Sequence, residues 1–492
     1  MQGAISTVAE MREHIHSRRG RRQSNKVLHA HPSPLFWRGP EVPVADIINN
    51  PAVSGGGPVS LYVATPYCLP TNPSRCGFCL FPSEDYHRSS QLDEYLHYLS
   101  LECDLYRPHV ESLPVTSVYF GGGTANLYRD GVYRQLCEVV RNLFPLLSAD
   151  AEITLEGIPQ LFNDRKLRAM KDAGINRVSI GVQQLQDRLI KFSGRHQTAD
   201  QVYRTLAWCA ENDVVTSVDL IFGWPTQTVE DMLSDLEIMV GLGVRHITHY
   251  ELNVAGRSDF ARTHRDSLPS IEDNLQMYRA GRDFLLSRGF RQATPYDFEK
   301  RDPSSPRQGT YAYEEATRNF TYDGAEQKQV PQMLGLGFAA VSIFPGSARD
   351  PGTAYMNPTT VADYAKALEA GRFPANRFFA YSEKDRHLLA IFQSLQSMRI
   401  DRRGYRAVFG EDVYEEFPLV WEALREEGWL SATEDFLETV GDGVFFTPLI
   451  QATLAQERVK EIQQQSSGKP VRPMVQLRVQ PTSTQPIGRN QS

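Results

Sequence analysis

Three cysteines, Cys68, Cys76 and Cys79, lie close together in the segment CLPTNPSRCGFC. Thiolates at this density are typical ligands of zinc or of an iron–sulfur cluster in a reducing compartment. A structural zinc site usually takes two ligand pairs, but only one C-x2-C pair is present, and His87 is the nearest further candidate ligand. Three thiolates suit a [4Fe–4S] cluster with one iron left open, although most protein clusters take four cysteines. The spacing alone therefore leaves zinc and a cluster as alternatives.

The remaining cysteines are isolated in the sequence. Cys103, Cys137 and Cys209 each fall in a segment with helical periodicity, where a lone cysteine usually serves as a small buried hydrophobic residue. A disulfide framework is a poor explanation for 6 cysteines in 492 residues, because disulfide scaffolds are short, secreted and dense in cysteine.

A glycine run follows a strand-like segment further along the chain. The segment VTSVYF, residues 115–120, leads directly into GGGTAN, residues 121–126. Glycines at the end of a strand allow close approach of the backbone to a ligand. A phosphate-binding loop is a weak reading because no Gly-Lys-Ser/Thr follows, and a tight turn would explain the glycines if they stood alone.

Several segments resemble, in the same order, the motifs of the HemN-like radical S-adenosylmethionine (radical SAM) enzymes. The resemblance spans roughly residues 60–450 and rests on YVATPYC…CGFC, VYFGGGT, ITLEGIP, NRVSIGVQQLQD…GR, VDLIFGWPTQT and MLGLGFAAVSIF. The family includes oxygen-independent coproporphyrinogen III oxidases, class C radical SAM methylases and cyclopropanases, and anaerobic haem-opening methylases. The resemblance favours a [4Fe–4S] cluster over zinc. It also implies an α/β fold, a partial (β/α)6 radical SAM barrel followed by a mostly α HemN-like C-terminal domain.

The resemblance assigns roles to individual residues. Cys68, Cys76 and Cys79 would hold three irons, and the fourth iron would chelate the amino and carboxylate groups of SAM. Tyr62 occupies the position of a SAM contact in the family. The other positions that the resemblance places beside SAM are Gly121, Gly122, Gly123, Thr124, Glu156, Gln183, Arg195 and Asp219.

Two of these positions are unusual on physical grounds as well. Glu156 and Asp219 each lie within or at the end of an apolar strand-like run, where an unpaired carboxylate would be costly. The ordinary alternative is a buried carboxylate paired with a structural arginine such as Arg177. For Arg195 the ordinary alternative is a surface salt bridge, and Gln183 could cap a turn.

Two departures separate the chain from the oxidases of the family. The gap between Cys68 and Cys76 holds seven residues, LPTNPSR, where the family usually has three. The oxidases also carry an aromatic residue and a further cysteine around this motif and a YTSYPTA-like N-terminal stretch, in place of which this chain has GFCL and HAHPSPLFW. The departures favour methylation or cyclopropanation at an sp2 carbon of a planar unsaturated substrate, with a second SAM as co-substrate.

Two other functions remain open. One is decarboxylation of a tetrapyrrole propionate to a vinyl group, as in coproporphyrinogen III oxidase. The other is a haem-binding carrier without catalysis, whose axial ligands would be His29 and His31, or His246 and His249. The segment HAHPSPLFW, residues 29–37, is in addition a candidate lid over the active site.

A framework of alternating strands and helices must position these residues. Apolar strand-like runs occur at 59–65, 115–120, 151–156, 176–182, 215–222 and 244–252, and helical patterns separate them. This alternation predicts a parallel sheet, either an incomplete barrel or a doubly wound sheet, with functional residues at the carboxyl ends of the strands. We expect an N-terminal arm that is partly disordered, a barrel, a HemN-like domain and a disordered tail, at residues 1–58, 59–297, 298–455 and 456–492.

The charge and hydropathy of the chain limit the kinds of binding partner that we expect. The chain has 52 basic and 59 acidic side chains and a net charge of −7, which argues against nucleic acid as the main partner. Because no apolar run is long enough to span a membrane and no signal peptide is recognisable, we expect a cytoplasmic protein. Its partners would be a small-molecule substrate and a one-electron donor such as flavodoxin or ferredoxin.

Overall fold

The computed structural model describes residues 5–22, 30–54, 59–252, 254, 258–302, 311–313, 315, 321–323, 326–329, 332–347 and 350–465. His29, residues 55–58 of the predicted N-terminal arm and most of the predicted C-terminal tail, from residue 466 onward, lie outside these ranges. None of the helices in the described ranges combines the length and hydropathy of a membrane span.

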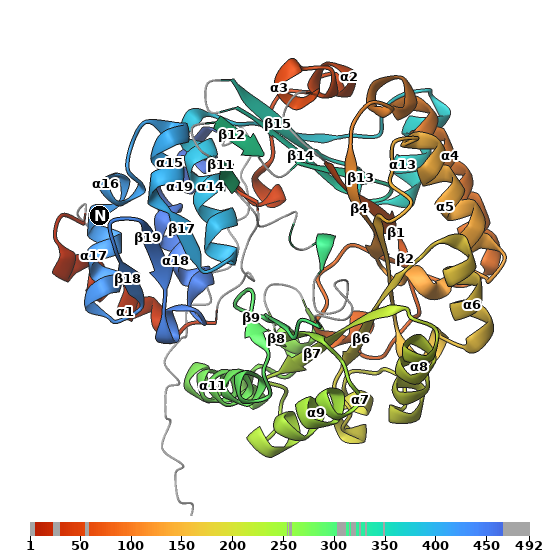
Figure 1. Ribbon diagram of the computed structural model, residues 1–492, viewed down its shortest axis with the longest axis horizontal. Coiled ribbons are helices and arrows are strands. Elements are labelled where there is room, and N and C mark those ends of the chain that lie inside the picture. Colours follow the sequence, from red (N-terminus) through yellow and green to blue (C-terminus); the bar gives the residue numbers. More distant parts are fainter. Residues whose placement is uncertain are drawn as a thin grey trace, which may run out of the picture.

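A curved sheet of twelve strands forms the centre of the molecule (Figure 1). Six consecutive neighbours in it are parallel, namely β1 (Val59–Thr65), β4 (Val115–Gly122), β5 (Glu152–Gly157), β6 (Arg177–Gln183), β7 (Val215–Phe222) and β8 (His246–Glu251). All six strands predicted from apolar runs are therefore confirmed, and two of them have the predicted bounds. The partial (β/α)6 barrel is also confirmed.

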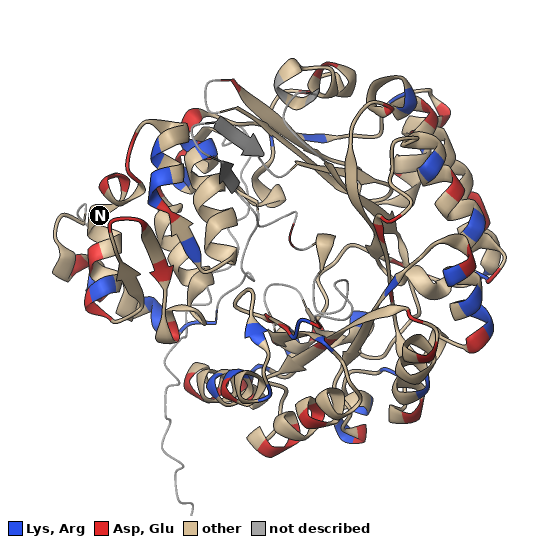
Figure 2. Cartoon of the chain, viewed as in Figure 1, with Lys and Arg blue, Asp and Glu red and all other residues tan. Residues whose placement is uncertain are grey.

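Helices cover the convex side of this sheet (Figure 1). They are α4 (Ser89–Val110), α5 (Val132–Leu143), α6 (Asp164–Ala173), α7 (Asp187–Phe192), α8 (Ala199–Glu211), α9 (Val229–Gly241) and α11 (Ile271–Ser287). Capping boxes start three of them, at Thr198, Thr228 and Ser270, where the side chain accepts a hydrogen bond from the third backbone N–H of the helix. Charged side chains lie mainly on these helices and on the C-terminal unit, and few lie on the parallel strands (Figure 2).

The two faces of the parallel strands differ in chemistry. The outward residues are apolar and belong to the core shared with the helices, for example Leu61, Val118, Leu155, Val178, Val218 and Ile247. The alternate residues face the concave side and are polar, aromatic or glycine, among them Tyr62, Tyr119, Gly121, Glu156, Ser179, Gly181, Asp219 and Thr248. Because side chains alternate along a strand, the in-register pairing places Tyr62, Gly121, Glu156 and Asp219, four of the predicted SAM-facing residues, on one interior surface.

Further strands extend the sheet on both sides. β10 (Asp297–Glu299) and β9 (Arg291–Gln292) follow β8, and β13 (Gln332–Leu336), β14 (Val341–Gly346), β15 (Pro351–Met356) and β16 (Arg377–Ala380) follow β1. β13 runs parallel to β1, with Leu61 opposite Leu334. Residues 332–380 therefore belong to the same sheet as the barrel strands, so the predicted boundary at residue 298 does not coincide with a break in hydrogen bonding.

The C-terminal unit is mostly helical, as predicted, and lies beside the open side of the curved sheet (Figure 1). It contains α14 (Glu383–Gln396), α15 (Arg402–Phe409), α16 (Val413–Glu416), α17 (Pro418–Glu426), α18 (Thr447–Leu454) and α19 (Gln456–Gln465). Its small sheet has the order β17 (Arg399–Asp401), β19 (Phe436–Thr439), β18 (Leu430–Ala432). The rings of Trp429 and Phe446 stack at 4.6 Å in its core, which continues into the barrel at Phe222, Met232 and Leu275. α19 occupies the start of the stretch that we expected to be a disordered tail.

The N-terminal segment contributes a helix that its sequence pattern did not indicate. α1 (Val8–Arg19) packs on α17 and α18, with Ile15 buried and Arg12 bound to Glu427 at 2.7 Å. Short helices α2 (Val44–Ile48), α3 (Pro51–Ser54) and α13 (Val361–Glu369) pack against α4 or the neighbouring strands. Residues 5–22 and 30–54 are thus part of the folded body and not a solvated arm.

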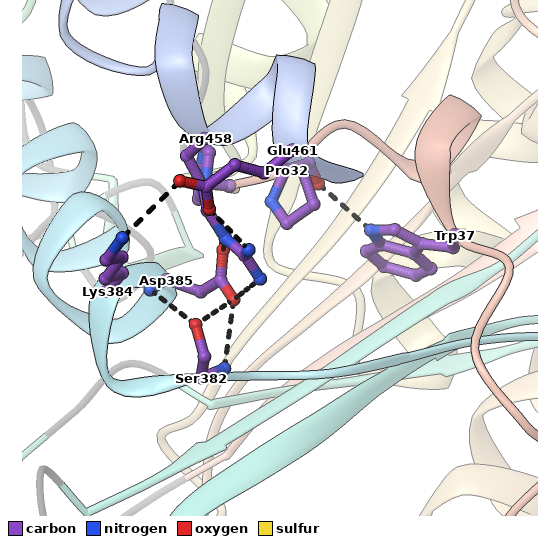
Figure 3. A network of polar contacts seen from close by, with 8 residues as sticks. Pro32, Trp37, Ser382, Lys384, Asp385, Arg458 and Glu461 are labelled. Carbon is purple, nitrogen blue, oxygen red and sulfur yellow. Dashed lines mark hydrogen bonds and ion pairs between the residues drawn. The ribbon is translucent and has the colours of Figure 1, made fainter. Parts of the chain in front are cut away.

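The described part of the candidate lid, residues 30–37, joins the C-terminal helices. His31 and Trp37 are buried, and the indole of Trp37 donates to the carbonyl of Pro32 at 3.0 Å. His31 lies 3.4 Å from the carboxylate of Asp385, which also binds Ser382 and Arg458 (Figure 3). This segment therefore packs onto the body of the protein, while its role as a lid stays a prediction.

Candidate active site

The three clustered cysteines lie in the loop that follows β1. Cys68 ends β2 (Tyr67–Cys68), which pairs with β3 (Glu84–Asp85), and Cys76 lies in a short 3-10 turn between them. None of these three cysteines forms a disulfide within the described residues, and all three are partly buried, whereas Cys103, Cys137 and Cys209 are buried as predicted. Among the described residues, no three His, Cys, Asp or Glu side chains converge closely enough to hold one metal ion. The charges of Cys79 and Cys76 both act on the Cys68 thiol, so the three thiols lie near one another, as the ligands of one cluster would.

A buried cation faces these thiols. Arg195 is 7% exposed, and its guanidinium donates to the carbonyl of Gly181 at 2.6 Å. Burial lowers the pKa of Arg195, while the nearby charges of Cys76, Cys68, Asp219 and Cys79 raise it. One guanidinium is therefore close to all three thiols and to a carboxylate. Positive charge at this place stabilises thiolates, the form that binds iron, so the residues present fit a thiolate-ligated cluster.

Two hydroxyl groups lie against the first thiol. Burial raises the pKa of Cys68 to about 11, and hydrogen bonds from Thr124 and Ser83 act in the opposite direction. Thr124 directly follows the glycine run, so the predicted glycine motif and the first predicted cluster ligand are in contact. Hydrogen bonds to a thiolate sulfur are one of the means by which proteins adjust the potential of an iron–sulfur cluster.

The glycine run packs against the backbone that leads into Cys68. Gly123 N–H donates to the carbonyl of Thr65 at 2.7 Å, and Thr124 N–H donates to that of Tyr67 at 2.8 Å. A Cβ atom on Gly123 would lie 2.5 Å from the Tyr67 oxygen, which the fold cannot accommodate. Gly122 has a φ of +104°, in the region that favours glycine. The glycines are thus required for close packing of two loops, whether or not they also contact a ligand.

An aromatic cluster lies on the interior surface below the cysteine loop. The rings of Tyr62 and Tyr119 stack with centroids 5.8 Å apart, and Tyr313 lies 4.8 Å from Tyr119. Burial and the neighbouring Glu156 raise the pKa of both Tyr62 and Tyr119. Tyr119 was missed in the sequence, although it precedes Gly121 by two residues and so shares its face of the strand. Tyr313 had no local signal, because it comes from a distant, turn-rich segment.

Gln183 and Arg195 meet above Gly181 at the end of β6. A Cβ atom on Gly181 would lie 3.0 Å from Nε2 of Gln183 and 3.8 Å from Nη2 of Arg195. Gln183 has a φ of +67°, and the pairing with β7 shifts at this point. Asp235 of α9 supports the segment that follows, because its carboxylate accepts hydrogen bonds from Leu185 N–H at 3.1 Å and from Gln186 at 3.0 Å. The bulge turns Gln183 toward the interior.

Three of the four histidines considered as haem ligands lie in the described part of the chain, and all three are packed in the fold. His249 faces outward beneath α11, against Phe222 at 4.7 Å, and burial lowers its pKa to about 3. His246 is fully buried with its ring 5.0 Å from that of Tyr311. His31 is held beside Asp385. His87, the possible zinc ligand, is exposed. The ion pair of Arg177 is with Glu152, at 2.9 Å.

Comparisons with known proteins agree with this arrangement. The Radical SAM superfamily matches residues 70–239. "Heme chaperone HemW" of Synechocystis sp. is 32% identical over 47% of this chain and 57% of its own length, so this chain matches little more than half of that relative. "Oxygen-independent coproporphyrinogen III oxidase" of Cereibacter sphaeroides is 25% identical over 76% of this chain and 80% of the relative. The protein of that name in Helicobacter pylori is 25% identical over 81% of this chain and 85% of the relative.

These relatives correct one interpretation of the sequence. The departures around Cys68 and Cys76 favoured a methylase or cyclopropanase, but the similarity is to proteins named as coproporphyrinogen III oxidases and haem chaperones. The seven-residue gap between the two cysteines is therefore not evidence for methyl transfer. Loop length between ligands changes easily, because closure entropy grows only slowly with length.

The fold of the chain is also similar to that of a protein named coproporphyrinogen III oxidase. The solved structure of coproporphyrinogen III oxidase from Escherichia coli superposes with a TM-score of 0.72, covering 88% of this chain and 99% of that protein at 21% identity. The barrel, the strands added after β1 and the helical C-terminal unit are thus shared. Residues 70–239 thus match the Radical SAM superfamily, whose cofactors are a [4Fe–4S] cluster and SAM, and over most of its length the chain is similar to HemN-like radical SAM enzymes.

Proposed function

We propose that this enzyme removes the carboxylate of a tetrapyrrole propionate as carbon dioxide and leaves a vinyl group. The observation that carries the proposal is the length of the similarity. The two proteins named coproporphyrinogen III oxidase align with 76% and 81% of this chain, which is more than the barrel alone, whereas the haem chaperone aligns with 47%. The substrate would be a small molecule with several carboxylates.

The cofactors would occupy the interior end of the barrel. Cys68, Cys76 and Cys79 would hold the cluster, supported by the charge of Arg195 and the hydroxyl of Thr124. The residues proposed to face SAM are Tyr62, Gly121, Gly122, Gly123, Thr124, Glu156, Gln183, Arg195 and Asp219. Their side chains and backbone lie on the interior surface or beside the cysteine loop, which supports this assignment.

When bound, the cluster and SAM supply a one-electron cleavage that gives methionine and a 5′-deoxyadenosyl radical able to take one hydrogen atom from carbon. Conversion of –CH2–CH2–COO⁻ to –CH=CH2 releases carbon dioxide, that hydrogen atom and one electron, for which we expect a one-electron acceptor. The tyrosines on the interior surface would exclude water from the reacting side chain, since Tyr62 and Tyr119 pack face to face there. The reducing electron would come from a flavodoxin or ferredoxin.

The test is a single-turnover reaction under anaerobic conditions. Reconstituted protein is mixed with coproporphyrinogen III, SAM and dithionite, and the products are identified by mass spectrometry. We expect one carbon dioxide and one 5′-deoxyadenosine for each vinyl group formed, and no methyl group transferred from labelled SAM. Cleavage of SAM without any change in the porphyrinogen would overturn the proposal.

Haem binding without decarboxylation is the second candidate, because the similarity to the haem chaperone reaches 32% identity. Titration of the same preparation with haem, followed by absorbance, distinguishes the two. Stoichiometric haem binding together with failure of the turnover assay would favour the chaperone. Decarboxylation without stable haem binding would exclude it.

A further inference from the structure

The seven residues between Cys68 and Cys76 form a folded element with its own internal bonds. The hydroxyl of Thr71 accepts a hydrogen bond from Cys76 N–H at 2.9 Å and donates one to the carbonyl of Pro73 at 2.8 Å. One side chain near the middle of the segment therefore fixes the backbone of the second cysteine. Arg75 adds a further contact, from its guanidinium to the carbonyl of Ser83 at 3.0 Å.

A helix that is distant in the sequence also binds this segment. Ser74 N–H donates to the carboxylate of Asp259 at 2.8 Å, and Asp259 begins the helix α10 (Asp259–Thr263). The ring of Phe260, the next residue, lies against Gly77, where a Cβ atom would be 2.2 Å from the ring. The segment is thus bound by a part of the chain that follows β8.

A third contact to the segment between Cys68 and Cys76 comes from the loop that contains Gly194. The carbonyl of Asn72 lies over Gly194, on which a Cβ atom would be only 2.4 Å from that oxygen. Gly194 has a φ of +69° and directly precedes Arg195. The widened segment therefore contacts the residue next to the cation that faces the thiols.

These contacts surround two residues in a costly backbone conformation. Arg75 and Cys76 have φ values of +50° and +56°, a region that residues other than glycine seldom adopt. Such a conformation persists only where the surrounding structure imposes it. The backbone of Cys76 determines the direction of its thiol, so the bonds to Thr71 and Asp259 act on the position of that sulfur.

We propose that Thr71 and Asp259 are positioning residues that fix the thiol of Cys76 for cluster binding, and that the widened segment is the element through which they act. This inference rests on the proposed role of Cys76 as a cluster ligand. The thiol of Cys76 can then have a fixed position despite the long gap between Cys68 and Cys76, because hydrogen bonds hold the added residues in place. α10 becomes part of the support of the cluster although it is far away in the sequence.

The experiment compares variants that remove each bond with variants that keep it. Thr71→Val removes the hydroxyl and Thr71→Ser retains it; Asp259→Ala removes the carboxylate and Asp259→Asn retains an oxygen that accepts from Ser74. Thr433→Val is the matched control, because the Thr433 hydroxyl also accepts from a backbone N–H, that of Phe436 at 3.0 Å, and donates to a carbonyl, in the turn between β18 and β19 of the C-terminal unit. All proteins are reconstituted anaerobically with iron and sulfide.

The first measurement is the rate at which a chelator removes iron from the reduced, reconstituted protein. We expect Thr71→Val and Asp259→Ala to lose iron about tenfold faster than the parent, the effect of about one hydrogen bond. Thr71→Ser, Asp259→Asn and Thr433→Val should be close to the parent. Equal rates for all variants would overturn the inference.

The second measurement does not depend on the cluster. Hydrogen exchange of the protein without iron should show faster exchange at residues 71–77 in Thr71→Val than in the parent or in Thr433→Val. Unchanged exchange would overturn the inference even where iron loss is faster. The variant Cys76→Ala separates the two proposals. Full iron content in that variant would show that Cys76 is not a cluster ligand. Hydrogen exchange in the Thr71 variants would still test whether Thr71 fixes the backbone of Cys76.

Discussion

Glu102 accepts a hydrogen bond of 2.7 Å from the hydroxyl of Tyr364, although both side chains are completely buried. The same carboxylate accepts from Gly337 N–H at 2.6 Å and from Asn357 at 2.7 Å. These bonds join α4 to the turn between β13 and β14 and to α13. Burial raises the pKa of Glu102 to about 7, and the three hydrogen bonds only partly oppose that effect.

The raised pKa predicts a pH dependence of stability. The folded protein holds the Glu102 proton more tightly than the unfolded chain, so this contribution is complete below about pH 4.5 and is lost as the pH rises through about 7. We expect it to lower the free energy of unfolding by about 3 kcal/mol across that window. Urea unfolding at several pH values measures it. In Glu102→Gln the unfolding free energy should no longer show this decrease with rising pH. An unchanged pH dependence would contradict the assignment to Glu102.

Replacing the clustered cysteines should abolish iron binding. Cys68→Ser, Cys76→Ser and Cys79→Ser each remove one proposed ligand, and we expect less than about a tenth of the parent iron content after reconstitution, because three thiolates are needed for a stable site. Iron and sulfide analysis and the visible absorbance of the cluster measure the effect. Cys103→Ala, Cys137→Ala and Cys209→Ala are controls, since these buried thiols pack among hydrophobic residues. Loss of iron in the controls, with the clustered variants unaffected, would reverse the assignment.

Arg195 should influence the potential of the cluster. Replacing it with Met removes the positive charge that faces the three thiols, so reduction, which adds negative charge, becomes harder. We expect a midpoint potential more negative by on the order of 60 mV, equivalent to a tenfold change for a one-electron couple. A redox titration followed by electron paramagnetic resonance measures it. Arg195→Lys should restore part of the shift, and Arg188→Met, at an exposed ion pair with Asp231, should cause none. An unchanged midpoint potential of the cluster in Arg195→Met would rule out the charge effect.

The ion pair between Arg458 and Asp385 should be important for stability. Asp385 is fully buried and binds Arg458 at 2.8 Å, beside His31 (Figure 3). Arg458→Met would leave the carboxylate without this partner, and we expect a loss of about 3–5 kcal/mol in unfolding free energy. Lys460→Met, which removes an exposed pair with Glu457, is the control and should cost less than about 1 kcal/mol. Equal midpoints in a urea titration for both variants would contradict this view.

The sequence was sufficient to locate the parallel strands and the cysteine loop. Val59–Thr65 and Val215–Phe222 were predicted with their observed bounds, because β-branched and other apolar residues make up most of both short segments. α1 was missed because its sequence is polar on most sides and only Ile15 is buried, so that its packing has no periodic signal.

Other features depend on contacts between distant segments. Ser74 and Asp259 are 185 positions apart, and neither the bond between them nor the stacking of Tyr313 on Tyr119 leaves a local pattern. The pairing of β13 with β1 could not be read from MLGLGFAAVSIF, which resembled the start of a separate domain. The candidate site was thus predicted as a set of residues, whereas the residues that support it became visible only in three dimensions.

The position of β13 beside β1 has a consequence for synthesis of the protein. β1 gains its second neighbour from residues that follow it by more than half the length of the chain. At about 5–20 residues per second, the ribosome needs roughly 15–55 s to deliver them, and during that time the edge of β1 is open to pairing with another chain. Since the cysteine loop begins where β1 ends, iron loading should follow completion of the second half of the polypeptide.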